Sequence, residues 1–138
     1  MKKRRQILTQ LLDQLKTITP TNGFTTAIGN KASYWEVYPE DYAGPATVTF
    51  YETSQETDFA NAYNHVLSID IVAIAYTNTA NRLTDSSNLL DDLYRAVIEE
   101  NWCDPGVIVR PVATEKEIEG KGKQAIKMTL TIEVEFRD

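Results

Sequence analysis

The residue types that most often carry out chemistry in proteins are sparse in this 138-residue chain. Its only histidine is His65 and its only cysteine is Cys103, so the sequence does not support a metal site built from several such ligands. We expect His65 to open a strand as a half-exposed structural residue. We expect Cys103 to be a buried or half-buried thiol without a reaction. No transition-metal site is predicted.

Carboxylates are the remaining candidates for acid–base chemistry. The acidic pairs at 91–92 and 99–100 fall in a segment with helical periodicity, where adjacent side chains point in different directions. Asp91 and Glu99 flank Arg95 at four-residue spacing, which is typical of a solvated helix face. We therefore predict no catalytic residue, no cofactor and no enzymatic activity. The other acidic residues that a fold could bring together, without any informative spacing, are Glu52, Asp58 and Asp70.

The charge of the chain is unevenly distributed. Its formal net charge is −6, but residues 2–5 are all basic, so the remaining residues carry −10. An acidic body is not expected to bind nucleic acid by neutralising phosphates, and we expect the basic residues simply to be solvated. No apolar run approaches the roughly 20 residues that span a bilayer, and the basic start is expected to begin an amphipathic helix of a cytoplasmic protein.

The strands that would position any site are shown by alternating apolar and polar residues. Residues 126–136 alternate without a miss, which places six apolar side chains on one face of a sheet. Residues 66–76 predict a second long strand, and residues 34–38, 46–52 and 107–113 predict shorter ones. The segments 53–62 and 115–124 are polar and predict a mobile loop and a charged hairpin, respectively.

Two helices, each with a single apolar stripe, complete the expected architecture. The first covers residues 3–18 and ends before Pro20, whereas the second has its N-cap at Thr84 or Asp85 and continues to about residue 101. Together with the sheet they predict an α+β fold. We expect a two-layer sandwich in which both helices pack on one face of a mostly antiparallel sheet, with residues 1–138 as one domain.

The order and spacing of these elements resemble the tail terminator (tail-completion) proteins of long-tailed bacteriophages, the family that includes the minor tail protein U of lambda-like phages. The resemblance runs from the helix at 7–18 through the strands at 46–52 and 66–76 and the helix at 89–98 to the hairpin that leads into 126–136. It implies a structural protein of the virion tail that is present in the bacterial cytoplasm during assembly.

The resemblance also implies partners. Such proteins form a homo-oligomeric ring, usually of six copies, on the last ring of the tail tube protein. There they end polymerisation and provide the surface to which the head–tail connector protein joins. It implies no cofactor, no reaction and no membrane, and DNA would meet the protein only by passing through the lumen.

A ring requires contacts between copies, and we expect them at two places. Val72, Ile74 and Tyr76 give the long strand a second apolar face, although burial within the domain is an open alternative. Pro111 lacks an N–H group, so its strand belongs at a sheet edge or contains a bulge. The other interface candidates, in that strand and in the charged hairpin, are Arg110, Glu119, Lys121 and Lys123. The loops at 58–63 and 115–123 are expected to be mobile in the free subunit and to become ordered on assembly.

Three alternatives stay open. The chain could be another head–tail connector or a tail tube subunit. It could be an α+β domain that binds a small ligand or peptide in a groove beside the aromatic residues Tyr34, Trp35 and Tyr38. It could also be a hydrolase or nuclease that uses scattered carboxylates. Particle size, saturable ligand binding and metal-dependent turnover, respectively, would separate these classes from the tail terminator.

Overall fold

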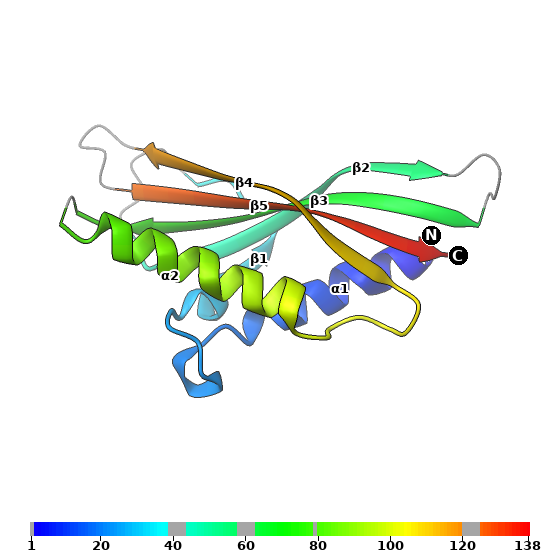
Figure 1. The fold of residues 1–138 in the computed structure, drawn as a ribbon, viewed down its shortest axis with the longest axis horizontal. Helices are drawn as coiled ribbons and strands as arrows, with labels where there is room; N and C mark the ends of the chain where they lie inside the picture. Colours follow the sequence, from blue (N-terminus) through cyan, green and yellow to red (C-terminus); the bar gives the residue numbers. More distant parts are fainter. Residues whose placement is uncertain (1, 39–43, 58–62, 79, 120–124) are drawn as a thin grey trace.

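A five-stranded sheet with helices on one of its faces forms the molecule in this computed structural model (Figure 1), which describes residues 2–38, 44–57, 63–78, 80–119 and 125–138. The sheet order is β1-β2-β3-β5-β4. The elements are α1 (Lys2–Lys16), η1 (Pro20–Asn22), η2 (Ile28–Lys31), β1 (Ala32–Tyr34), β2 (Thr47–Thr57), β3 (Asn64–Tyr76), α2 (Arg82–Tyr94), η3 (Arg95–Glu99), β4 (Ile108–Glu119) and β5 (Ala125–Arg137).

The predicted α+β fold is confirmed. Every pair of neighbouring strands is antiparallel except β1 and β2, which run parallel. Both α1 and α2 lie under the same face of the sheet, and the opposite face has no helix on it in the described part of the chain (Figure 1). No helix among the described residues is long and apolar enough to cross a membrane.

The central strands β3 and β5 show why the sheet has two unlike faces. They pair without a register shift from Asn64↔Arg137 to Tyr76↔Ala125. Because side chains alternate along a strand, all six apolar residues of β5 between 126 and 136 are buried toward the helices, and the polar residues between them are only half-buried. The alternation that the sequence shows in this strand therefore corresponds to the core face and the open face.

The helices contribute their apolar stripes to the same core. Ile7, Leu11 and Leu15 of α1 are fully buried, and Leu89 and Leu93 are the buried apolar residues of α2. The second helix then changes to a π-helical turn, η3, which continues the stripe with Ala96 and Val97. Burial of this stripe is the main stabilisation of both helices, since a helix of this length is marginal alone.

Several element boundaries differ from the sequence prediction. The aromatic strand expected at 34–38 is wrong, because β1 ends at Tyr34 and Trp35 has a φ of 55°, which is incompatible with a continuing strand. The second helix starts at Arg82 with Asn81 as its N-cap, three residues before the predicted N-cap Thr84.

Two strands are longer than predicted. β2 continues past residue 52 to Thr57 and β4 continues past residue 113 to Glu119, so parts of the expected loop and hairpin are strand. Their polar sequence is compatible with strand because β3 and β5 supply hydrogen-bonding partners along the whole length. The remaining predicted loop residues, 58–62 and 120–124, lie outside the described residues.

Candidate assembly surfaces

His65 and Cys103, the only histidine and the only cysteine of the sequence, both contact residues of the fold and belong to no metal-binding cluster among the described residues. His65 is buried, not half-exposed as expected, because its ring packs 5.3 Å from that of Phe136 and its Nδ1 lies 3.2 Å from the Thr57 hydroxyl. Cys103 is half-buried, as predicted, and burial raises the pKa of its thiol, which disfavours the reactive thiolate. Among the described residues, no group of three or more histidine, cysteine or acidic side chains is placed to hold a metal ion.

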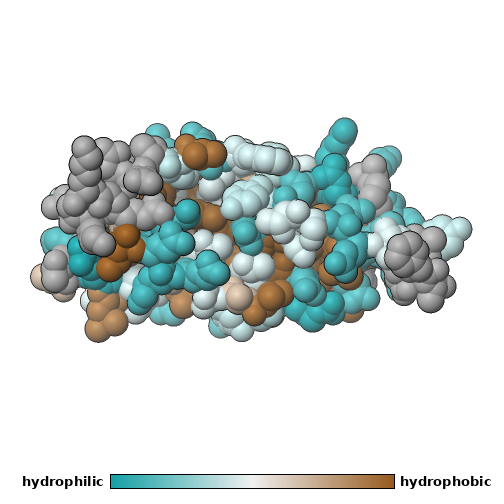
Figure 2. All heavy atoms as spheres, turned by 90° about the horizontal axis from the view of Figure 1, so that it is seen from above, coloured by the Kyte–Doolittle hydropathy of each residue, from teal (hydrophilic) through white to brown (hydrophobic). Residues whose placement is uncertain are grey.

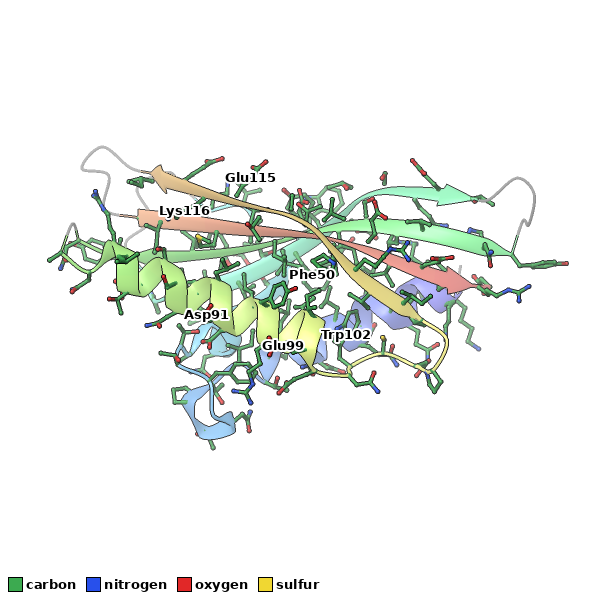
Figure 3. The ribbon with its side chains drawn as sticks, viewed as in Figure 1. Phe50, Asp91, Glu99, Trp102, Glu115 and Lys116 are labelled. Carbon is green, nitrogen blue, oxygen red and sulfur yellow. The ribbon has the colours of Figure 1, made fainter. Side chains whose placement is uncertain are left out.

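The carboxylates Asp91 and Glu99 lie on a solvated face, as their spacing predicted. Both are exposed on the outer side of the helix (Figure 3). Arg95, which lies between them in the sequence, donates to the Gly23 carbonyl oxygen at 2.8 Å and pairs with Glu100 at 3.3 Å, while its guanidinium lies 4.1 Å from the centre of the Phe24 ring. Arg95 therefore anchors the segment that follows α1.

The open face of the sheet is mainly acidic. The strand register places Asp70 of β3, Glu133 of β5 and Glu115 of β4 on it, and Figure 2 shows this face as mixed, with hydrophobic residues only scattered among polar ones. Arg110 pairs there with Glu135 at 3.0 Å and with Glu133 at 3.8 Å. By register, the charged residues on this face include the acidic residues Glu56, Asp70, Glu115, Glu117, Glu133 and Glu135 and the basic residues Arg110, Lys127 and Arg137.

Part of the open face is covered by the segment 35–38. The amide of Glu36 donates to the Thr49 hydroxyl at 2.9 Å, and the hydroxyls of Tyr38 and Thr47 lie 3.1 Å apart. A cavity of about 230 Å³ remains beneath this segment and is lined by Trp35, Glu36, Val37, Tyr38, Thr49, Tyr51, Val72, Ile74 and Lys127.

Residues 35–38 cover part of the apolar interface that the sequence predicted. Val72 and Ile74 are only 6% and 2% exposed within the single chain, whereas Tyr76 is 50% exposed. Burial within the domain, the alternative left open by the sequence, thus describes the first two residues. Of the three, only Tyr76 leaves a large part of its side chain exposed at the surface.

The second predicted interface lies on the edge strand β4. Arg110 and Pro111 are exposed there, and the register shifts between Pro111 and Ala113, so the proline lies both in an edge strand and at a bulge, as its missing N–H group predicted. Val112 lies inside this bulge and is 54% exposed. Glu119 is the last residue of β4, and Lys121 and Lys123 lie outside the described residues.

A groove at the opposite edge of the sheet was not predicted. It lies between α1 and the β1–β2 edge, has a volume of about 250 Å³ and combines an apolar floor with two arginines at its rim. The only sequence signal for it is a second row of leucines, Leu8 and Leu12, beside the main stripe of α1. Its lining residues are Arg4, Arg5, Leu8, Thr9, Leu12, Tyr34 and Phe50.

One end of this groove is fixed by a small polar cluster. Arg4 forms an ion pair with Glu52, and the Tyr34 hydroxyl donates a hydrogen bond to the same carboxylate. Burial, and then the hydrogen bond to and the charge of Glu52, raise the pKa of Tyr34 to about 12. Tyr34 is therefore a hydrogen-bond donor at all ordinary pH values.

Comparison of the chain with models of known protein families gives no match. Comparison with curated proteins gives no match either.

Proposed function

We propose that this chain is a structural subunit of a phage or prophage tail, a tail terminator that forms a ring on the tail tube, ends its polymerisation and presents the surface for the head–tail connector. The observation that carries the proposal is an α+β sheet with unlike edges, β4 on one side and the α1–β1 groove on the other. Unlike edges suit head-to-tail contacts, and such contacts close into rings when the rotation between copies is right.

Size makes self-association a requirement of this role. A domain of 138 residues has a radius of gyration of roughly 14 Å, which is too small to enclose a DNA duplex. A lumen can therefore form only between copies. The acidic excess of the chain supports passage of DNA without adhesion, since like charges repel the phosphate backbone.

Electron microscopy can test the role directly. Tail tubes assembled from the tube protein of the same phage or prophage are expected to grow without a defined end, and addition of this chain should stop their growth and leave a ring at one end. Native mass spectrometry of the purified chain should show one defined oligomer. Tubes that grow unchanged in the presence of intact rings would contradict the terminator role.

A second candidate function is favoured by the cavity beneath residues 35–38. Trp35 is 62% exposed beside it and has a φ of 55°, and such strained residues gather at binding sites. A monomeric chain that binds a peptide saturably, with a change in Trp35 fluorescence that Trp35→Phe removes, would favour a binding module over a tail subunit.

A further inference from the structure

We infer that the contact between copies is made by Val112 of one chain, which enters the α1–β1 groove of the next chain, and by an ion pair between Glu115 of the first and Arg5 of the second. This inference rests on the proposed ring and names its two interacting surfaces. The occupant of the groove is thus a second copy of this chain.

The strand register places the two surfaces on opposite edges of the sheet and at the same height, meaning the same position along the strand direction. Across the sheet, Phe50 lies in line with Ile71, Leu130 and Thr114. One step along, Glu52 lies in line with Ile69, Ile132 and Pro111. Rotation about an axis parallel to the strands therefore brings the bulge at residue 112 of one copy opposite the groove beside Phe50 of the next.

The apolar parts of the two surfaces are complementary. The groove floor is formed by Leu8, Leu12 and Phe50, and it is open at the surface. On β4 at this height, between Pro111 and Ala113, the exposed large apolar side chain is Val112. A bulge turns a side chain away from the regular alternation of a strand, and an apolar side chain that fills a groove is the usual anchor of an interface.

One pair of opposite charges is available for the same contact. Arg5 is exposed at the groove rim and makes no ion pair among the described residues, since Lys3 is paired with Asp104 and Arg4 with Glu52. Glu115 is exposed on β4 and is likewise without an ion pair in the described part of the chain (Figure 3). Because the chain beyond residue 5 is strongly acidic, the cationic rim of the groove is attracted to another copy of the chain.

Edge-to-edge pairing of β4 through its backbone is disfavoured by the same residues. Pro111 removes a donor, the bulge interrupts the ladder, and charged side chains such as Glu115 and Glu117 follow. These are devices that prevent open-ended strand addition. The side chains of the edge, and not its backbone, are therefore assigned to the contact.

Sedimentation and native mass spectrometry of variants test the anchor. Val112→Arg places a cation against the cationic rim and should weaken association at least about 100-fold. Ile108→Arg is the matched control, because Ile108 is a similarly exposed apolar residue at a different position along β4. This control variant should leave association within about threefold of the wild type. Circular dichroism confirms that both variants are folded. Equal oligomerisation of the two variants would overturn the inference.

A charge exchange tests the pairing. Arg5→Glu alone and Glu115→Arg alone should each weaken association at least about 100-fold, and the double variant should recover it. Association should also recover in a mixture of the two single variants. In rings of alternating composition, the altered groove of one variant meets the altered edge of the other, and the two unaltered surfaces meet each other. Failure of both the double variant and the mixture to recover would overturn the inference.

The outcomes separate this inference from the proposed function. A wild-type chain that stays monomeric at every concentration overturns the self-docking contact. Rings that depend on Val112 and on the Arg5–Glu115 pair, but that do not cap tail tubes, support the contact and contradict the terminator role.

Discussion

Asp92 illustrates how much of this fold depends on single residues that bridge distant segments. Its carboxylate is buried and accepts hydrogen bonds from the amides of Thr25 and Thr26, at 3.2 and 2.7 Å, and from the Thr26 hydroxyl at 2.6 Å. These bonds attach the segment after α1 to α2. The sequence could not predict this role, because the partners are 66 and 67 residues away and Asp92 is indistinguishable in type from its exposed neighbour Asp91.

Replacement of Asp92 by alanine should lower the free energy of unfolding by about 3 kcal/mol, because two backbone amides lose a charged acceptor in a buried place. Urea denaturation measures this change. Asp91→Ala is the matched control, and it should stay within about 0.5 kcal/mol of the wild type since Asp91 is exposed. Equal losses for the two variants would show that the hydrogen bonds of Asp92 contribute nothing specific.

The pKa of Tyr34 gives a second test at this scale. Because its folded pKa is raised to about 12, the protonated phenol contributes stability that is fully present below pH 10 and is lost as the pH rises toward 12. Phenolate absorbance during alkaline titration, compared with Tyr34→Phe, isolates this residue. Glu52→Gln should move the Tyr34 pKa toward its ordinary value, because the carboxylate acceptor and its negative charge are gone. An unchanged titration in Glu52→Gln would contradict the contribution assigned to Glu52 and leave burial as the cause of the raised pKa.

At the scale of elements, the sequence predicts best where one face of a regular element is buried. The period of two in β5 and the apolar stripes of the two helices are found in the fold as predicted. The reason is that the apolar residues that produce each pattern are the residues that the fold buries. Strand ends are predicted poorly, since the outer halves of β2 and β4 are polar and are strand only through their partners. The groove combines α1 with β1 and β2, so no local pattern in the sequence could show it.

The close approach of η2 to the end of α1 depends on a glycine. A Cβ atom at Gly29 would lie 2.6 Å from the Leu15 carbonyl oxygen and 2.7 Å from that of Lys16, and neither backbone group can move easily. Gly29→Ala should therefore lower the free energy of unfolding by about 3 kcal/mol. Gly106 has a φ of +88° but open space around it, so Gly106→Ala should cost only about 1 kcal/mol. Thermal unfolding of both variants decides whether steric contact outweighs backbone strain; the reverse order would refute this ranking.

At the scale of the whole molecule, the acidic excess would affect the proposed assembly in two opposed ways. Copies with a net charge of −6 would repel one another, while the basic start of α1 would attract Glu115 of the next copy. The local attraction acts over a few ångströms at the groove rim, and the repulsion acts over the whole surface. Which of the two controls the rate of assembly can be decided by salt.

Salt should slow ring assembly from monomers and leave the finished ring intact. Raising the ionic strength from about 0.1 M to about 1 M shortens the screening length from about 10 Å to about 3 Å, so the steering of Glu115 toward Arg5 is lost. We expect the association rate to fall roughly tenfold, while dissociation changes little because the contact of Val112 with the groove floor is apolar. Light scattering after dilution from denaturant measures the association rate, and Arg5→Gln should assemble slowly at every salt concentration. A rate that rises with salt would show that repulsion between the acidic bodies, and not attraction at the groove, governs assembly.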